Sequence, residues 1–409
     1  MRIKPFVTYR PHPEVALELA SLPYDVGDLE DARELARANP KSFLHVERPE
    51  VDLPPDSPPG LDHQTAAANL HTFLQNHWLQ PDPQPSLYLY RICLGHLTQT
   101  GIVACCHIDD YDNNLIKKHE KTKKPVEDQR TEHVLATRAN TGPIFLTFRD
   151  QPDLNQRIQT ATQAPHLLDF TAIDGIRHTV WKLPDPQSWV DAFQSVPAAY
   201  VADGHHRTAA AARAGQALRQ ANPHHTGHEE YNWFLSVLFP ASHLNVIAYN
   251  RTCANLNDLS PSQFLARLTT ILHLEPTTET RPTAPGTCCM YLDQTWYKLT
   301  WTPDPHADPV SALDVSVLQD RVLQPLLGVD DPRTDPRMAY AGGFDSIERM
   351  VKRVDTGRAA VAFSMFPTTV DQLIAIADAN QIMPPKSTWF EPKLRSGLFV
   401  HPIDGLPSP

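Results

Sequence analysis

Residues 200–208 read YVADGHHRT, and an alanine-rich tract follows them at residues 209–214. A short apolar run therefore ends at Asp203, and a helix-forming tract begins near Arg207. This pattern predicts a strand-to-helix corner that carries a carboxylate, two imidazoles and a guanidinium. Backbone N–H groups at a helix N-terminus bind anions, and an adjacent arginine adds a bidentate phosphate contact. We expect the corner to bind a phosphate or a metal–phosphate; the alternative is that Asp203 only caps the helix and Arg207 is solvated.

The composition is that of a soluble globular chain with many prolines. Of its 409 residues, 41% are hydrophobic, 20% are charged and 39 are proline, several of them in the loop at residues 53–59. The 36 Lys and Arg residues against 47 Asp and Glu residues give a net charge of −11, which argues against a general nucleic-acid binder. The sequence has neither an apolar run of about 18 residues nor a signal-like start. We therefore expect a cytoplasmic protein with small-molecule partners and no membrane contact.

Helix and strand patterns alternate along the chain. Strands are predicted at 43–46, 87–92, 101–108, 143–148, 178–183, 288–300 and 359–366. Helices are predicted at 29–38, 63–78, 187–195, 261–272, 311–327, 345–353 and 369–380, and residues 233–239 and 243–249 are predicted to pair as a hairpin. This mixture of hairpins and helices indicates an α+β, or mixed α/β, fold with mixed sheets rather than a doubly wound parallel sheet.

The second segment with chemical potential is the charged stretch at residues 117–130. Glu120 lies there among several lysines, in the sequence KKHEKTKK. A local positive field attracts a polyanionic donor, and a carboxylate within it can act as a base or a metal ligand. The simpler interpretation is a solvated charged loop.

Three further segments carry polar groups suited to binding. The proline-stiffened segment at residues 384–393 offers ammonium, hydroxyl and amide donors for phosphate oxygens, from Lys386, Ser387, Thr388 and Lys393. The segment after the expected first strand carries His45, Arg48 and Glu50, of which Arg48 suits an anion or carboxylate. The histidines His224, His225 and His228 are a weaker metal-site hypothesis in a loop-like region. The Walker, dinucleotide-binding and HExxH motifs are absent from the sequence.

The chain resembles a family of prokaryotic proteins that carries a domain-of-unknown-function label. The matching segments are SLPYDV at 21–26, HVERPE at 45–50, KHEKT at 118–122, YVADGHHR at 200–207, and PPKST at 384–388 with KLRSG at 393–397. The DGHHR corner also resembles the active-site corner of the ParB/sulfiredoxin-like superfamily, which includes free-serine kinases. The two resemblances imply a ParB-like catalytic core with an N-terminal elaboration at residues 1–250. They also imply an α/β region at 251–409 that contributes the 384–395 loop to the same site.

The second resemblance implies phosphoryl transfer to free L-serine, giving O-phosphoserine, with Mg²⁺ and a diphosphate-containing donor. Pyrophosphate, ADP and ATP all remain open as donors. In this interpretation the catalytic residues are Glu120, Asp203 and His205, with Asp203 and Glu120 also holding the metal. The donor phosphates are assigned to His206, Arg207, Thr208, Lys386, Ser387, Thr388 and Lys393. The substrate is assigned to His45, Arg48, Glu50 and His119. A nucleotide- or nucleic-acid-binding regulator and a metal-dependent phosphate hydrolase are the alternatives.

Overall fold

The computed structural model describes residues 1–404 and divides into two compact units. The first unit comprises residues 1–244 and the tail that begins at Pro392, and the second comprises residues 245–391. The tail therefore belongs to the first unit, whereas the sequence placed it in one region with residues 251–391. The last five residues of that predicted region, 405–409, lie outside the described residues.

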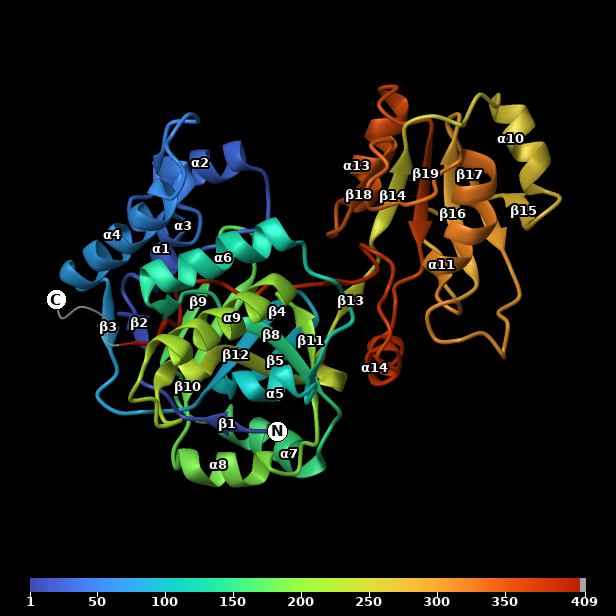
Figure 1. Cartoon of the computed structure of the whole chain (residues 1–409). Helices are drawn as coiled ribbons and strands as arrows, with labels where there is room; N and C mark the ends of the chain where they lie inside the picture. The colour runs from blue at the N-terminus through green and yellow to red at the C-terminus, as the bar shows by residue number, and fades with distance from the viewer. Residues whose placement is uncertain (405–409) are drawn as a thin grey trace. The chain divides into compact units, whose positions relative to one another are not determined.

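The first unit is built on a nine-stranded mixed sheet (Figure 1). The strand order is β6-β11-β8-β12-β5-β4-β10-β9, with β1 paired to β5. The pairs β6–β11 and β8–β12 are parallel, and the remaining pairs are antiparallel. The strands are β1 (Ile3–Lys4), β4 (Tyr88–Leu94), β5 (Leu97–His107), β6 (Ile116–Lys117), β8 (Ile144–Phe148), β9 (Leu168–Thr171), β10 (Arg177–Lys182), β11 (Ala199–Asp203) and β12 (Trp233–Pro240).

Nine α-helices of the described residues belong to this unit, and α6 and α9 run side by side (Figure 1). They are α1 (Ala16–Leu19), α2 (Leu29–Ala38), α3 (Leu44–Glu47), α4 (Leu61–Gln75), α5 (Ile108–Asp112), α6 (Lys124–Thr137), α7 (Pro152–Ala161), α8 (Pro186–Phe193) and α9 (His205–Ala221). Two short ribbons pair β2 (Tyr9–Pro11) with β3 (Leu79–Pro81), and β7 (Ala139–Asn140) with β21 (His401–Pro402). The second ribbon joins the tail to the body of the unit.

The core of the first unit follows from strand periodicity. Alternate residues of a strand face the same side of the sheet. Accordingly, Ile102 and Cys106 of β5 and Leu146 of β8 lie in one buried cluster with Trp189 of α8 and Ala212 of α9. The small side chains of α9 let its axis approach the sheet closely. This close packing fixes the start of α9 relative to the end of β11.

The second unit contains a six-stranded antiparallel sheet of order β15-β17-β16-β19-β14-β18. Its strands are β14 (Asn250–Cys253), β15 (His273–Pro276), β16 (Thr287–Leu292), β17 (Thr295–Thr300), β18 (Met338–Ala341) and β19 (Val361–Met365). Its helices are α10 (Pro261–Leu268), α11 (Asp314–Leu318), α12 (Gln324–Leu327), α13 (Ser346–Asp355) and α14 (Val370–Asp378). A short pair, β13 (Val246–Ile247) with β20 (Trp389–Phe390), brings the two ends of the unit together.

The mixed α/β class is confirmed, and two local predictions are wrong. Residues 43–46 form the start of α3 rather than a strand. The predicted hairpin of 233–239 with 243–249 does not form, because β12 inserts between β5 and β8 and pairs with both. A strand with two long-range neighbours cannot be distinguished from a hairpin arm by its own apolar pattern.

Two further features are the state of the cysteine thiols and the length and apolarity of the helices. All six cysteines are free thiols, and five of them are buried. Within residues 1–404, the helices lack the combination of length and apolarity that crossing a bilayer requires.

Candidate functional site

The corner predicted from the sequence forms at the junction of β11 and α9. Asp203 ends the strand, His205 begins the helix, and Gly204 between them has φ +94°. This left-handed conformation favours glycine, because a Cβ atom is strained there. A Cβ atom at Gly204 would also lie 3.1 Å from Nε of Arg207. The N-cap residue Gly204 has no side chain with which to cap the first turn of α9, and the N–H groups at a helix N-terminus favour anions.

Asp203 is held by a cation from the tail of the chain. Lys393 donates a hydrogen bond from Nζ to Asp203 Oδ2 at 2.9 Å, and 24% of the Asp203 side chain is exposed. Burial acts to raise the pKa of Asp203, but Lys393 and Arg207 outweigh it and hold that pKa well below its usual range. Asp203 is therefore ionised at neutral pH. The expected proximity of Asp203 and Lys393 is thus found, across 190 residues of sequence.

Arg207 supplies the buried positive charge of the corner. Its side chain is buried, and Nη1 donates to the carbonyl oxygen of Pro143 at 2.7 Å. Burial acts to lower the pKa of Arg207, but the carboxylates of Asp25 and Asp203 outweigh it and raise that pKa. The guanidinium Nε has no hydrogen-bond partner within residues 1–404. The positive charge of Arg207 is therefore permanent, and its Nε donor remains without a partner in these residues.

A buried ion pair contributes to the electrostatic environment of Arg207. Arg130 of α6 donates to the carboxylate of Glu47 at 3.0 Å and to its carbonyl oxygen at 3.1 Å. The same guanidinium lies 4.2 Å from the ring centre of Tyr24. Tyr24 and Glu47 both contribute to the electrostatic environment of Arg207. This pair connects the SLPYDV and HVERPE segments to the corner.

Glu47 is the residue that the sequence analysis missed. It is 1% exposed, and its Oε1 lacks a hydrogen-bond partner in the described part of the chain. A Cβ atom at Gly142 would lie 2.8 Å from that oxygen and 3.1 Å from Oγ of Ser396. With Tyr24 and Arg130, Glu47 lines a cavity of about 10 Å³, which is about the volume that one water needs.

The motif segments of the first unit therefore converge in space. Ser21 pairs through its backbone with Ser396 of the tail, and Gly142 brings that serine close to Glu47. Tyr24, Pro143 and Arg207 then link this cluster to Asp203. In the sequence, the family motifs indicated that these segments would meet, whereas the number of residues between them gave no such information.

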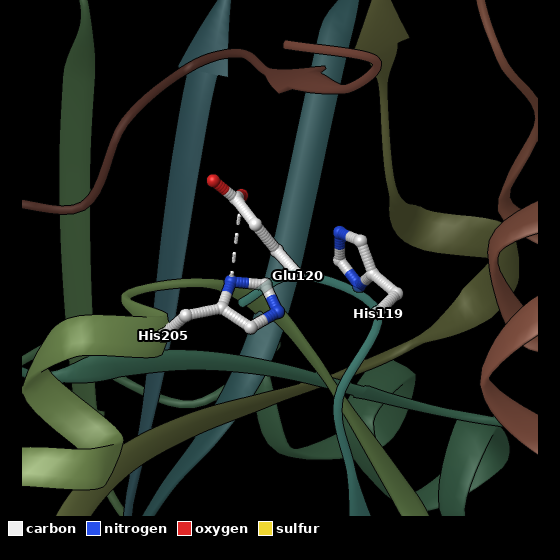
Figure 2. A group of neighbouring side chains, drawn as sticks. All are labelled: His119, Glu120 and His205. Carbon is white, nitrogen blue, oxygen red and sulfur yellow. Dashed lines mark ion pairs between the residues drawn. The ribbon is translucent and has the colours of Figure 1, made fainter. Parts of the chain in front are cut away.

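His119, Glu120 and His205 form a separate group at the same corner (Figure 2). One potential ligand atom from each lies within 4.8 Å of the others, and Glu120 Oε2 is 3.9 Å from His205 Nδ1. Burial lowers the pKa of His119 to about 4. Burial, with the neighbouring His119, lowers the pKa of His205 well below its usual value. Both rings are therefore neutral at pH 7, and the three side chains can hold a metal ion.

The metal ligands predicted from the sequence are only partly brought together. Glu120 belongs to the group, but the carboxylate of Asp203 is engaged by Lys393 instead. The two imidazoles also make the donor set rich in nitrogen, whereas Mg²⁺ prefers oxygen ligands and keeps several waters. The group does not fit a resident Mg²⁺ ion.

His206 and Thr208 make local contacts that stabilise the corner. Nε2 of His206 accepts the N–H of Lys123 at 2.9 Å, which ties the KHEKT segment to α9. Thr208 is fully buried, and its hydroxyl donates to the carbonyl oxygen of Gly204 at 2.9 Å. This hydroxyl is engaged within the first turn of α9, and the assignment of Thr208 to a donor phosphate stays a prediction.

The residues assigned to substrate near position 45 pair with their own neighbours. Nδ1 of His45 lies 2.8 Å from Asp52, and this hydrogen bond raises the pKa of His45. Arg48 donates to the carbonyl oxygen of Gly27 at 3.2 Å and lies 3.7 Å from Glu50. Because residues 44–47 are helical, Glu47 rather than His45 points into the core of the site.

The remaining assigned residues lie elsewhere in the chain. Lys386, Ser387 and Thr388 belong to the second unit, where the Ser387 hydroxyl donates to the carbonyl oxygen of Pro384 at 2.7 Å. Their contribution to the corner stays a prediction. His225 pairs with Glu229 at 2.9 Å, and the potential metal group found in residues 1–404 includes no histidine of that loop.

The chain matches the model of a known protein family. A family model described as "Protein of unknown function (DUF1015)" matches residues 3–316. The chain belongs to the DUF1015 family. The match covers more than half of the chain and includes the corner, Glu47 and Glu120, while the tail with Lys393 lies beyond the matched span. A search of curated proteins finds no significant match.

Solved structures similar to this DUF1015 protein are remote in sequence. A conserved hypothetical protein from Pyrococcus furiosus is 13% identical, with 73% of this chain and 95% of that one covered at a TM-score of 0.36. A free serine kinase in complex with AMP is 11% identical, covering 73% and 91% at a TM-score of 0.37. SbnI from Staphylococcus aureus, truncated at its C-terminus, is 14% identical, covering 73% and 87% at a TM-score of 0.35.

Proposed function

We propose that this DUF1015 protein is a small-molecule phosphotransferase that phosphorylates free L-serine to O-phosphoserine. The observation that carries the proposal is the pair of cations, Arg207 and Lys393, that flank an ionised Asp203 at the N-terminus of the 17-residue helix α9. The donor contains a diphosphate, and pyrophosphate, ADP and ATP are the three candidates. The resemblance of the DGHHR segment to the corner of free-serine kinases supplies the acceptor.

The chemistry of phosphoryl transfer matches this set of groups. The transition state carries its charge on the equatorial phosphate oxygens, so catalysis depends on placed cations and N–H donors and on an oriented nucleophile. Arg207 is buried and pinned by Pro143, so its charge acts in a medium of reduced dielectric constant. The N-terminus of α9, where the helix dipole is positive, begins next to Asp203. Together they favour a phosphate over a neutral ligand.

The two carboxylates of the corner suit different tasks. A carboxylate whose pKa is strongly depressed is a weak base, so Asp203 is assigned to positioning Lys393 and the serine hydroxyl rather than to taking its proton. Glu120 has 44% of its side chain exposed and can approach a bound substrate. We assign Glu120 as the group that accepts the serine proton. Phosphate oxygens of the donor would hold the accompanying Mg²⁺, since the potential metal group found in residues 1–404 contains two imidazoles and Mg²⁺ prefers oxygen.

The test compares carboxylate variants in a phosphoserine assay with each donor. Asp203→Asn and Glu120→Gln are expected to lower turnover about a hundredfold or more while leaving the fold intact. Asp153→Asn is the matched control, because Asp153 forms a surface ion pair with Arg157 at 2.7 Å, and such pairs contribute little.

The outcomes separate the proposal from its rivals. Wild-type rates in the Asp203 or Glu120 variant, with any active donor, would contradict the assigned roles. Release of inorganic phosphate without O-phosphoserine would identify a hydrolase that uses water as its nucleophile. Circular dichroism of each variant verifies that a lost rate does not reflect an unfolded chain.

A further inference from the structure

Two buried imidazoles and one carboxylate meet at the corner from two parts of the chain. His119 and Glu120 lie in the segment between β6 and α6, and His205 is the first residue of α9 (Figure 2). The hydrogen bond from the Lys123 N–H to His206 holds this segment against the helix start. The juxtaposition is therefore fixed by the backbone on both sides.

The geometry is compact. The exposed fraction is 2% for His119 and 7% for His205. Their ring centres are 4.5 Å apart, with the rings at 88° to each other. Glu120 Oε2 lies 3.9 Å from Nδ1 of His205, and one ligand atom of each residue lies within 4.8 Å of the other two. No comparable group of histidines, cysteines and carboxylates is found elsewhere in residues 1–404.

Three of the four ring nitrogens of these histidines make no hydrogen bond of normal geometry within residues 1–404. They are both nitrogens of His119, which lies beside the backbone of Val201, and Nε2 of His205. Buried polar atoms are nearly always paired, and leaving one unpaired costs about 1–3 kcal/mol. A neutral imidazole has one N–H and one lone-pair nitrogen, so these two rings offer one lone pair each beside a partly exposed carboxylate. A metal cation accepts the lone pairs of both rings at once.

We propose that His119, Glu120 and His205 form a binding site for a first-row transition-metal dication of the zinc class, distinct from the Mg²⁺ that accompanies a phosphoryl donor. Imidazole is a preferred ligand of zinc, iron and cobalt, whereas Mg²⁺ prefers oxygen. Two histidines and one glutamate are also a set known to bind zinc with a position left open. Metal–ligand distances of about 2.0–2.2 Å require these atoms to close inward by roughly 1 Å, which the partly exposed Glu120 can follow.

The site goes beyond the proposed phosphotransferase, since it depends only on these three residues. One oxygen of Glu120 can serve the metal while the other faces a substrate, so both assignments can hold together. Binding is measured without serine or donor. A failure of the metal site therefore leaves the phosphoserine assay to decide the function separately.

The experiment is a calorimetric titration of the chelator-treated full chain with Zn²⁺, with Co²⁺ absorption as a geometric readout. The expected result is one equivalent of Zn²⁺ bound, a visible band for tetrahedral Co²⁺, and no displacement by millimolar Mg²⁺. His119→Ala, His205→Ala and Glu120→Gln should each weaken Zn²⁺ binding about a hundredfold or more. The Glu120 variant replaces a partly exposed group, so it tests the site even if a buried histidine variant unfolds.

The control variant is His224→Ala with His228→Ala, in a loop outside the group, and it should bind Zn²⁺ like the wild type. The proposal is overturned if no stoichiometric Zn²⁺ or Co²⁺ binds. It is also overturned if Glu120→Gln binds like the wild type, or if the loop variant loses the metal instead.

Discussion

Gly204→Ala is a precise test of how the corner is built. Gly204 has φ +94°, and an alanine there pays the left-handed backbone strain of about 1–2 kcal/mol. Its Cβ atom would also lie 3.1 Å from Nε and 3.2 Å from Cζ of Arg207. The guanidinium must shift by a few tenths of an ångström, which weakens its hydrogen bond of 2.7 Å to the Pro143 carbonyl. A hydrogen bond from a charged donor is worth about 1.5–3 kcal/mol.

The expected destabilisation of Gly204→Ala is therefore larger than the strain alone of about 1–2 kcal/mol, with an upper bound of about 5 kcal/mol if the hydrogen bond is lost altogether. Gly60 provides the matched control, because it also precedes a helix, has φ +83° and has no atom within 4 Å of a Cβ placed on it. Gly60→Ala should cost only the strain, about 1–2 kcal/mol. Urea unfolding followed by circular dichroism gives both values, and the phosphoserine assay should show a loss of turnover for Gly204→Ala alone. Equal stability of the two variants would refute the close packing of Arg207 on Gly204.

Three further predictions concern buried charges of the first unit. Lys393→Met should lower phosphoserine turnover about a hundredfold or more. Adding Asp203→Asn should lower turnover little further, because both residues act through one ion pair. Fully additive losses of turnover would contradict the pairing. Glu47→Gln leaves the Arg130 guanidinium without its buried counter-charge. The variant should therefore lose about 3–5 kcal/mol of unfolding free energy in urea. A loss of unfolding free energy under about 1 kcal/mol would argue against the pair. Burial and the charge of Arg395 lower the pKa of His178 from 6.5 to about 3, so the unfolded state takes up a proton that the folded state excludes. Stability should therefore fall as pH drops from 6.5 toward 3, and His178→Gln should remove about 1.4 kcal/mol per pH unit from that slope; an unchanged slope would refute it.

Local sequence patterns predicted the regular elements of the fold well. The helix predicted at residues 29–38 matches α2, which Asp28 caps by accepting the N–H of Asp31. The strands predicted at 87–92 and 101–108 lie in β4 and β5, which pair as a hairpin. These features depend on neighbours in sequence, so they can be read locally. The insertion of β12 between β5 and β8 depends on partners far away, and periodicity carries no information about them.

The site shows the same division between local and distant causes. The strand-to-helix corner follows from the apolar run, Gly204 and the alanine tract. The strand predicted at residues 43–46 placed His45 and Arg48 as the binding residues, whereas the helical turn of α3 buries Glu47 instead. The pairing of Glu47 with Arg130 joins residues 83 positions apart. Such a pair can be proposed only after the fold brings α3 and α6 together.

The proposed reaction is phosphoryl transfer to free L-serine at the Asp203–Arg207 corner. The most direct measurement is ³¹P NMR of the purified chain with L-serine and Mg²⁺, with ATP, ADP and pyrophosphate in separate samples. We predict an O-phosphoserine signal with one of these donors, lost in Asp203→Asn and kept in Asp153→Asn. The absence of O-phosphoserine with all three donors would contradict the proposed function.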